Sequence, residues 1–482
     1  MKSIFTVLYC IPFYCMVSGQ QVTRLSLEEV VSMAKQQSIA ARQALTTRET
    51  RFWEWKTFLS NYKPQLVLNG NLPSFTRSFT QVVQPDGTIQ FQPIRYNNSS
   101  IDLSLFQSVE QTGGRIYATT QLQRFDDFAR HNRLYNSSPF AIGYEQPLFK
   151  FNPLKWDKKI EPLKYAESEK SYLESLERIA IKATRYFFDL LLAQVNLQIA
   201  ETNLQNTTTI ENISKEKYEL GKISRNDILQ LSLESLKAQK AIANAKRNLE
   251  IATLNLRAYI AIPNENKVEL IMPGELTGVV IHNEKALSEA FENRSDAVKY
   301  KRQQLEAEQK VSKAIGDNGL NATLTASLGF SNRGNTIADV YQGPKRSEAI
   351  ELSLSMPILD WGRSKSRTRT AEADKKLTEY TIQQDLQNFK QEIYTQVTLF
   401  QMLHQELAIT AKTDSIASEK YQIAQERYVL GLLSTTDLSI AFTDKDQAKR
   451  DYINALQDYW ETHYGLRALT LYDFIKQEKI KQ

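Results

Sequence analysis

The residue types that most often carry chemistry are few in this chain and lie far apart. The histidines fall on separate predicted elements and lack the spacing of metal ligands. They are His131, His282, His404 and His463. The sequence shows no glycine loop that could cradle a phosphate, no nucleophile elbow and no pair of catalytic carboxylates. It therefore predicts no metal site, no cofactor and no enzymatic activity.

Two aspartates form a recurrent acidic feature, because each closes a copy of the same ten-residue stretch. The first copy is Tyr218-Glu-Leu-Gly-Lys-Ile-Ser-Arg-Asn-Asp227, and the second is Tyr428-Val-Leu-Gly-Leu-Leu-Ser-Thr-Thr-Asp437. In both copies a glycine interrupts a helical pattern, and the serine after it can cap the next helix. Each aspartate then falls in the first turn of that helix, where a negative charge is favourable to the helix dipole.

The repeat extends well beyond these turns. Position 218 corresponds to position 428, and the same offset of 210 residues aligns Gln146-Pro-Leu-Phe149 with Met356-Pro-Ile-Leu359. It also aligns Leu256-Arg-Ala258 with Leu466-Arg-Ala468. A constant offset across segments this far apart indicates a tandem duplication.

The composition of the 482-residue chain is that of a folded protein with a secretory signal. Its 60 basic and 55 acidic residues are interspersed, which is typical of solvated helices and argues against nucleic-acid binding. Lys2, an apolar run over 4–17 and small residues at 17–19 predict a signal peptide. Cys10 and Cys15 lie inside it, so we expect a mature chain without thiols. The alternative is that Cys15 becomes a lipid-anchored N-terminus.

Strands are expected in both halves, where apolar and polar residues alternate. Residues 320–330 and 350–356 alternate most regularly. Further strands are predicted at 65–72, 101–109, 115–123 and 140–149. Residues 73–100 are rich in Pro, Gly, Asn and Thr and predict a long loop. No segment has the apolar length of a transmembrane helix, so the chain could cross a membrane only with strands.

Long helical patterns surround the two turns. Helices are expected at 25–61, 153–220 and 284–315, in a segment that ends at 430, and in two segments that follow the turns and end near 262 and 474. Their apolar residues recur at alternating spacings of three and four, the heptad pattern of coiled-coil packing. A helix of about sixty residues is roughly 90 Å long, so it must pack along other helices rather than around one globular core.

The strands raise a problem that a single chain cannot solve. Too few are predicted to close a water-filled barrel, and an open sheet edge is not tolerated in lipid. We therefore expect several copies to close the sheet together, with cyclic symmetry.

The duplicated Tyr-x-x-Gly-x-x-Ser-x-x-Asp turn, the Gln-Pro-Leu-Phe strand end and the start at 25–44 resemble the TolC-like outer-membrane efflux proteins. The resemblance covers nearly the whole mature chain. It implies a mainly helical fold in which tandem helical hairpins and strand pairs trimerise into a transmembrane β-barrel, continued by a periplasmic α-barrel. It implies a passive channel of a tripartite efflux or type I secretion system in a Gram-negative outer membrane. The implied partners are two further copies of the chain, a periplasmic adaptor, an inner-membrane pump and outer-membrane lipid.

The same resemblance places the periplasmic tip at the two turns, where the family closes its channel and meets the adaptor. Asp437 matches the first of the family's gating carboxylates, and Asp227 is its counterpart in the first half. Ile440 stands where the second acidic residue is expected, so the implied pore constriction is only partly acidic. The residues assigned to adaptor docking are Leu220, Gly221, Ile223, Ser224, Leu430, Gly431, Leu432 and Ser434.

The first half departs from this pattern, because it carries more strand-like sequence than the two strands implied for each half. Residues 101–123 are either an extra hairpin outside the membrane or an enlargement of the sheet.

The expected organisation has five segments. They are a signal at 1–19, a first repeat at 20–262, a linker at 263–283, a second repeat at 284–474 and a polar tail at 475–482. A periplasmic coiled-coil adaptor without its own pore is the alternative function. Lipid-facing strands distinguish the channel from it, because an adaptor has no use for them.

Overall fold

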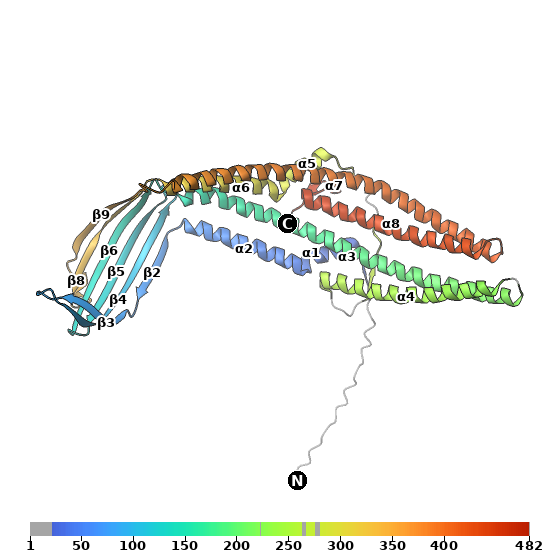
Figure 1. The fold of residues 1–482 in the computed structure, drawn as a ribbon, viewed down its shortest axis with the longest axis horizontal. Coiled ribbons are helices and arrows are strands. Elements are labelled where there is room, and N and C mark those ends of the chain that lie inside the picture. The colour runs from blue at the N-terminus through green and yellow to red at the C-terminus, as the bar shows by residue number, and fades with distance from the viewer. Residues whose placement is uncertain (1–21, 222, 263–266, 275–279, 482) are drawn as a thin grey trace, which may run out of the picture. The chain divides into compact units, whose positions relative to one another are not determined.

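The chain forms two compact units (Figure 1). The computed structural model describes residues 22–221, 223–262, 267–274 and 280–481, so the predicted signal lies outside the described residues. The strand unit consists of Thr47–Ser171 and Ser295–Phe389. The helical unit consists of the chain up to Thr46, Tyr172–Arg294 and the chain from Lys390 onward. Each unit therefore draws on both copies of the repeat.

One antiparallel sheet dominates the strand unit, with the strand order β2-β4-β5-β6-β8-β9 (Figure 1). The strands are β2 (Gln65–Asn71), β4 (Ile89–Val109), β5 (Gly114–Asp127), β6 (Asn132–Leu148), β8 (Asn321–Gly334) and β9 (Lys345–Ser355). A further strand, β3 (Phe75–Val83), pairs with β4 beyond the end of β2. We call the end of the sheet that leads into the helices the helix end, and the opposite end the distal end.

Strand alternation divides the side chains of this sheet between an apolar face and a polar face, since directly paired residues point to the same side. The apolar face carries Leu66, Leu68, Leu103, Leu105, Ile116, Ile142, Leu328, Ile350, Leu352 and Leu354. The polar face carries Asn69, Asp102, Ser104, Thr119, Gln121, Thr325, Ser327, Glu351 and Ser353. The apolar side chains are largely uncovered, as for Ile350, which is 83% exposed.

The sheet is larger than the sequence predicted. The prediction of a loop over 73–100 was wrong, because β3 and the first part of β4 lie there. The segment contains one tight turn, which joins β3 to β4. In this turn Gly87 has φ +81°, and the Gln84 N–H donates to the Thr88 carbonyl at 2.8 Å. Of the two alternatives for residues 101–123, the structure shows the enlargement, since β4 and β5 occupy the middle of the sheet.

The helices follow the predicted order with two unpredicted breaks. They are α1 (Leu27–Gln37), α2 (Ile39–Asn61), α3 (Pro153–Glu219), α4 (Arg225–Ile260), α5 (Asn283–Asn293), α6 (Ser295–Asn318), α7 (Arg363–Val429) and α8 (Thr435–Thr470). The predictions of single helices at 25–61 and 284–315 were wrong, because extended backbone at Ser38 and Arg294 interrupts them. The Ser38 hydroxyl accepts the Ala41 N–H at 3.0 Å and so caps the start of α2.

Two short pairings were not predicted. The parallel pair β1 (Val22–Leu25) and β7 (Lys267–Leu270) joins the start of the chain to the linker region. The last helix ends at Thr470 instead of 474. The polar tail then folds back, with β10 (Tyr472–Asp473) pairing with β11 (Glu478–Lys479).

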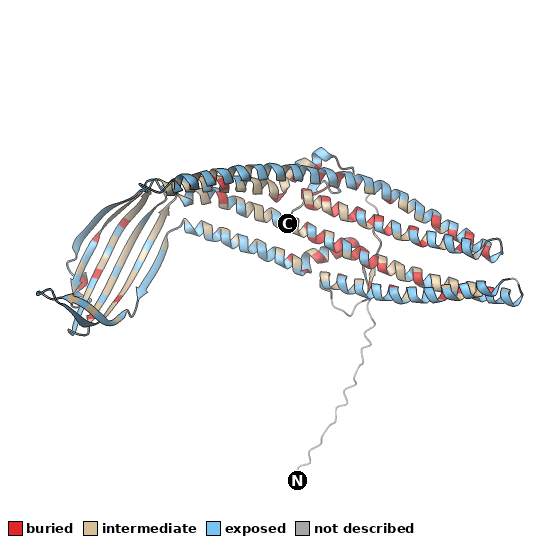
Figure 2. Ribbon diagram, in the orientation of Figure 1, coloured by how far each residue is buried: buried red, intermediate tan, exposed pale blue. Residues whose placement is uncertain are grey.

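The core of the helical unit lies where α3, α7 and α8 carry buried aromatic and aliphatic residues (Figure 2). The Phe400 and Tyr459 rings stack with centroids 5.0 Å apart. Beside this core, the Glu177 carboxylate is 1% exposed and pairs with Lys35 at 2.5 Å and Arg467 at 3.0 Å. Burial opposes the ionisation of Glu177, but attraction by Lys35 and Arg467 outweighs it and holds the pKa below its ordinary value. The cluster ties α1, α3 and α8 together.

Within the described ranges, every helix is either too short or too polar to span a bilayer.

Candidate functional site

The first turn between long helices joins α3 to α4. The Gly221 N–H donates to the Tyr218 carbonyl at 2.8 Å, and Gly221 has φ +71°, a conformation that favours glycine. Ser224 then caps α4, because its hydroxyl accepts the Asp227 N–H at 3.3 Å. The Asp227 carboxylate in return accepts the Ser224 N–H at 2.9 Å. These two bonds form a capping box.

The second turn, between α7 and α8, repeats this geometry. The Gly431 N–H donates to the Tyr428 carbonyl at 3.0 Å with φ +75° at Gly431. The Asp437 N–H donates to the Ser434 hydroxyl at 3.1 Å, and that hydroxyl donates to the Asp437 carboxylate at 2.7 Å. Both aspartates thus hold the start of a helix, as the residues alone predicted.

The two carboxylates are exposed although each is hydrogen-bonded inside its own turn. The hydroxyl and N–H of Ser224 stabilise the charged form of Asp227, so its pKa lies below the ordinary value. Ile440, one turn beyond Asp437 on α8, is also exposed. The residues predicted to form the constriction are therefore exposed to solvent in a single chain, where a second copy or a partner can reach them.

Both turns lie at the same end of the helical unit (Figure 1). Behind them, residues of α7 and α8 pack into a cluster that α3 also contacts. The cluster consists of Tyr421, Ala424, Tyr428, Leu438 and Ala441. The Asn206 amide of α3 donates to the Tyr421 hydroxyl at 2.8 Å. The turns are therefore presented on a packed base rather than on free loops.

The predicted docking residues are placed on the surface of these turns. Leu220 is 70% exposed and Leu432 is 72% exposed, and Leu430 is equally open. Gly221, Ser224, Gly431 and Ser434 are exposed, and Ile223 is half-buried. Large apolar side chains at an exposed tip are costly unless a partner covers them.

A second exposed apolar feature runs along α7 and was missed by the sequence prediction. We call it the α7 stripe; it consists of Met402, Ile409, Ile416 and Ile423, and it continues into Leu430 of the turn, one residue beyond the end of α7. Its members recur every seven residues on the side of the helix away from the buried seam. The heptad pattern predicted from the sequence is the stronger seam of the same helix, which contains Phe400, Leu407 and Tyr421 and is buried. A search for a second heptad on the same helix could have found the α7 stripe.

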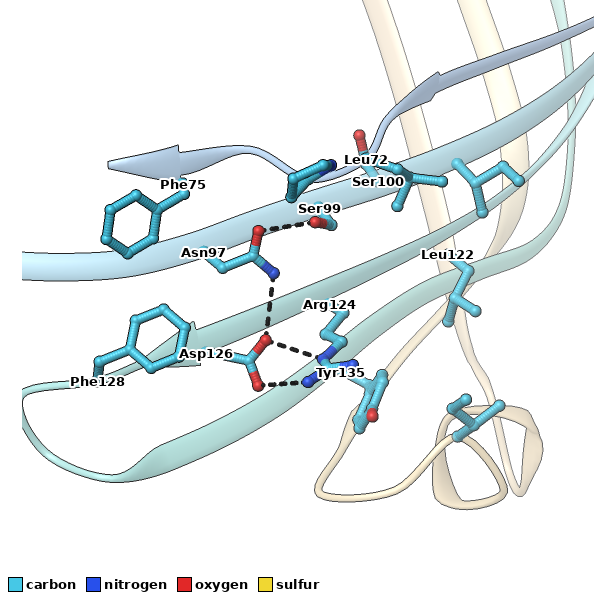
Figure 3. A pocket seen from close by; sticks show the side chains of 13 residues that line it. Leu72, Phe75, Asn97, Ser99, Ser100, Leu122, Arg124, Asp126, Phe128 and Tyr135 are labelled. Atoms are coloured by element: carbon cyan, nitrogen blue, oxygen red, sulfur yellow. Dashed lines mark hydrogen bonds and ion pairs between the residues drawn. The ribbon is translucent and has the colours of Figure 1, made fainter. Parts of the chain in front are cut away.

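A polar network interrupts the apolar face of the sheet toward its distal end (Figure 3). There, Asp126 of β5 is 6% exposed, accepts a hydrogen bond from Arg124 at 3.0 Å and forms an ion pair with the same side chain at 2.8 Å. Asn97 of β4 donates to the same carboxylate at 3.2 Å, and Arg133 of β6 lies 2.9 Å from it. The network lines a cavity of about 680 Å³ and ties three strands together. Beyond it, the same face continues with the exposed Phe75 and Phe79 of β3.

The described residues contain no group of three or more acidic, histidine or cysteine side chains that could hold a metal ion.

The described fold defines a class of protein in which long antiparallel helical hairpins carry an antiparallel sheet with one uncovered apolar face. Comparison with known proteins places the chain within that class. The model of the family described as outer membrane efflux protein matches residues 104–261 and 318–470, more than half of the chain. The chain belongs to the outer membrane efflux protein family. It is an outer-membrane efflux channel that extends into the periplasm and works in a tripartite system, and it is not an enzyme.

Solved structures show the same fold at low sequence identity. The CmeC outer membrane channel of Campylobacter jejuni has a TM-score of 0.67 at 15% identity, covering 95% of this chain and 87% of CmeC. The MtrE outer membrane channel of Neisseria gonorrhoeae, in its open state, has a TM-score of 0.61 at 14% identity, covering 95% and 91%. The outer membrane protein VceC of Vibrio cholerae has a TM-score of 0.62 at 14% identity, covering 94% and 97%. No curated protein matches the chain by sequence.

Family membership selects the channel over the coiled-coil adaptor that the sequence left as an alternative.

Proposed function

We propose that the chain works as a homotrimer whose turns dock on a periplasmic adaptor and whose pore passes cargo that an inner-membrane pump delivers. Two uncovered apolar features of the helical unit carry the proposal, the α7 stripe and the turn leucines Leu220 and Leu432. A single chain leaves both in water. Each needs a different partner, since one is a long helical seam and the other a small tip.

The α7 stripe fits a second copy of this chain. Its heptad spacing over four repeats is that of a helix packed on another helix along its length. The seam is uncovered in one chain, and α7 belongs to a hairpin whose own core is already filled by its other face. In the trimer, α7 packs on a hairpin of the next copy and the helices enclose a lumen.

The apolar face of the sheet fits the hydrocarbon of the outer membrane. Its rows of leucine and isoleucine face outward to lipid, and the hydroxyl and amide rows of the opposite face line the water-filled lumen, the alternation found in transmembrane strands.

The turn leucines fit an adaptor. Leu220 and Leu432 stand on the turns that family resemblance assigns to docking, and the packed base behind them holds them in place. The constriction is assigned to Asp227, Asp437 and Ile440, which three copies bring around the axis as rings of carboxylates and isoleucines. The isoleucine ring narrows the passage, and the carboxylate rings favour cations.

A photo-crosslinking amino acid at position 432 tests the docking claim in living cells. We expect one adduct with a periplasmic protein that carries a coiled-coil hairpin, identified by mass spectrometry. The matched control places the same amino acid at Ser415, an exposed position on α7 outside the turns. The same adduct from both positions, or adducts with the chain's own copies alone from position 432, would contradict docking at the turns.

A further inference from the structure

The two edges of the sheet are open along their whole length. β2 and β9 are the outermost strands, and every described residue of β9 is exposed. Unpaired strand edges are not tolerated in lipid, so both edges must be covered by other strands. The six strand positions alternate in direction, because every neighbouring pair is antiparallel. The edge strands β2 and β9 therefore run in opposite directions, and β9 of one copy can continue the antiparallel order with β2 of the next.

The central strands β4 and β5 are full members of this sheet rather than an appendage. They pair over fourteen residues, from Tyr96 with Asp127 to Val109 with Gly114. Their side chains follow the same division as β8 and β9. Leu103 and Leu105 lie on the apolar face, and Asp102 and Ser104 lie on the polar face. In the proposed channel, β4 and β5 therefore present their apolar face to lipid and their polar face to the lumen, as the other strands do.

The helix breaks locate the extra strands in the chain. Ser38 and Arg294 interrupt equivalent helices 256 residues apart, whereas the turns and strand ends repeat at an offset of 210 residues. The difference between the two offsets, 46 residues, is sequence that the first half holds before the end of β6 and the second half lacks. β3, β4 and β5 lie in that interval. The added segment is inserted at the distal end of the sheet, between the end of β2 and the start of β6. The pairs Asn71–Ser100, Ser100–Gln123 and Gln123–Asn136 show that these strand ends lie side by side.

We propose that three copies close an eighteen-stranded barrel, half again as many strands as the twelve that two strands per half would give. Three copies of a six-stranded sheet supply the eighteen, so the inference rests on the trimer proposed above. Barrel diameter grows roughly linearly with strand number, and barrels of 16–18 strands hold an open aqueous channel. The strand-built passage is therefore about 1.5 times wider than a twelve-stranded one. The limiting constriction is the one assigned to the turns, so the strand-built passage is the wider part of the channel.

A size-graded labelling experiment tests the width. Thr325→Cys places a thiol on the polar face of β8, in a chain whose other cysteines are Cys10 and Cys15 of the predicted signal. Maleimide-polyethylene glycols of increasing size are added outside intact cells. The comparison chain also lacks residues 74–131, which joins β2 directly to β6. We expect the largest reagent that labels the full chain to be about 1.5 times wider than the largest that labels the deletion variant.

The controls separate the width from the assembly. Leu328→Cys, on the apolar face of the same strand, should resist every reagent. Light scattering gives the number of copies of both chains. A trimer with the same size limit in both chains would overturn the eighteen-stranded barrel while leaving the trimer intact. A wild-type chain that is not trimeric would overturn the proposed function. If the deletion variant does not assemble, electron cryomicroscopy of the wild-type trimer counts the strands directly, and twelve would contradict the inference.

Discussion

At the scale of single residues, the structure shows what the repeated aspartates do in one chain, which is to cap α4 and α8. This role does not exclude the constriction, because the carboxylates remain exposed. The capping role and the constriction role require different properties of the side chain. The cap needs an acceptor oxygen, whereas cation preference needs a negative charge.

Asp437→Asn separates them. An asparagine oxygen still accepts the Ser434 hydroxyl, so α8 keeps its cap and the trimer keeps its thermal stability. The ring loses its charge, and we expect the ratio of cation to anion permeability in planar bilayers to fall. Asp451→Asn, an exposed position further along α8, is the matched control and should leave the ratio unchanged. An unchanged ratio for Asp437→Asn would remove Asp437 from the constriction.

His463 predicts a pH dependence of stability. Burial, reinforced by the charge of Arg467, lowers its pKa to about 4. Below pH 6.5 the imidazole of His463 therefore binds a proton in the unfolded chain, whereas in the folded chain it stays neutral until about pH 4. The free energy of unfolding should fall by on the order of 3 kcal/mol over that range, at 1.36 kcal/mol per pKa unit.

Thermal unfolding in detergent between pH 4 and pH 7 measures this effect. His463→Gln should flatten the dependence, because the group that charges on unfolding is gone. His404→Gln, at an exposed histidine, should leave the curve as it is in the wild type. Equal slopes for the His463 variant and the wild type would show that other groups carry the dependence.

At the scale of elements, the α7 stripe is the feature with most consequence for assembly. Ile416→Asp puts a charge in the middle of the seam, where a buried isoleucine contributes roughly 1.5–3 kcal/mol. The change occurs in every copy, so the fraction of trimer should fall by tenfold or more. Analytical ultracentrifugation in detergent measures it, and Ser415→Asp, beside the stripe, is the control. Equal trimer fractions for the two variants would mean that α7 does not face another copy.

The sheet makes a parallel prediction for the membrane. Leu352→Lys puts a charge on the apolar face of β9, which costs about 2–4 kcal/mol near the bilayer midplane. The yield of protein in outer membranes should fall accordingly. Ser353→Lys, the next residue and on the polar face, should have little effect. The opposite pair of results would mean that the polar face, not the apolar face, is exposed to lipid.

Much of this architecture could be predicted from the sequence, because repetition reinforced local patterns. The turns were identified by Gly221 and Gly431 together with the Ser-x-x-Asp caps, a signal that is complete within ten residues. The heptads predicted the buried seams for the same reason. Residues 73–100 were predicted as a loop because their Pro, Gly and Asn content outweighed the alternating Phe and Val of β3. Only pairing with β4, which is set by tertiary structure, decides in favour of the strand.

The helix breaks were missed for a different reason. Neither Ser38 nor Arg294 is a strong helix breaker, and both sit inside continuous helical patterns. Ser38 is held extended by its bond to the Ala41 N–H, and Arg294 lies near Glu174 and Glu392 at 3.8 and 3.6 Å. Contacts of this kind become visible only once the fold is known. The repeat identified the turns, and the resemblance to the family assigned the candidate site residues to them, whereas the exposure of these residues and the α7 stripe needed the structure.

At the scale of the whole molecule, the chain is incomplete by itself. It exposes a helical seam, two strand edges and an apolar sheet face, and each of these requires a neighbour. Two of the three are satisfied by further copies of the same chain, and the third by lipid. Cyclic assembly covers the seam and the edges together, which is why a trimer is the central claim.

The molar mass of the protein extracted from outer membranes tests that claim most directly. Light scattering corrected for bound detergent should give three times the mass of one chain, in several detergents. A trimer supplies the strands that close the sheet and the copies that cover the α7 stripe. A chain that stays monomeric in every detergent would contradict the account, because its edges and its seam would then have no partner.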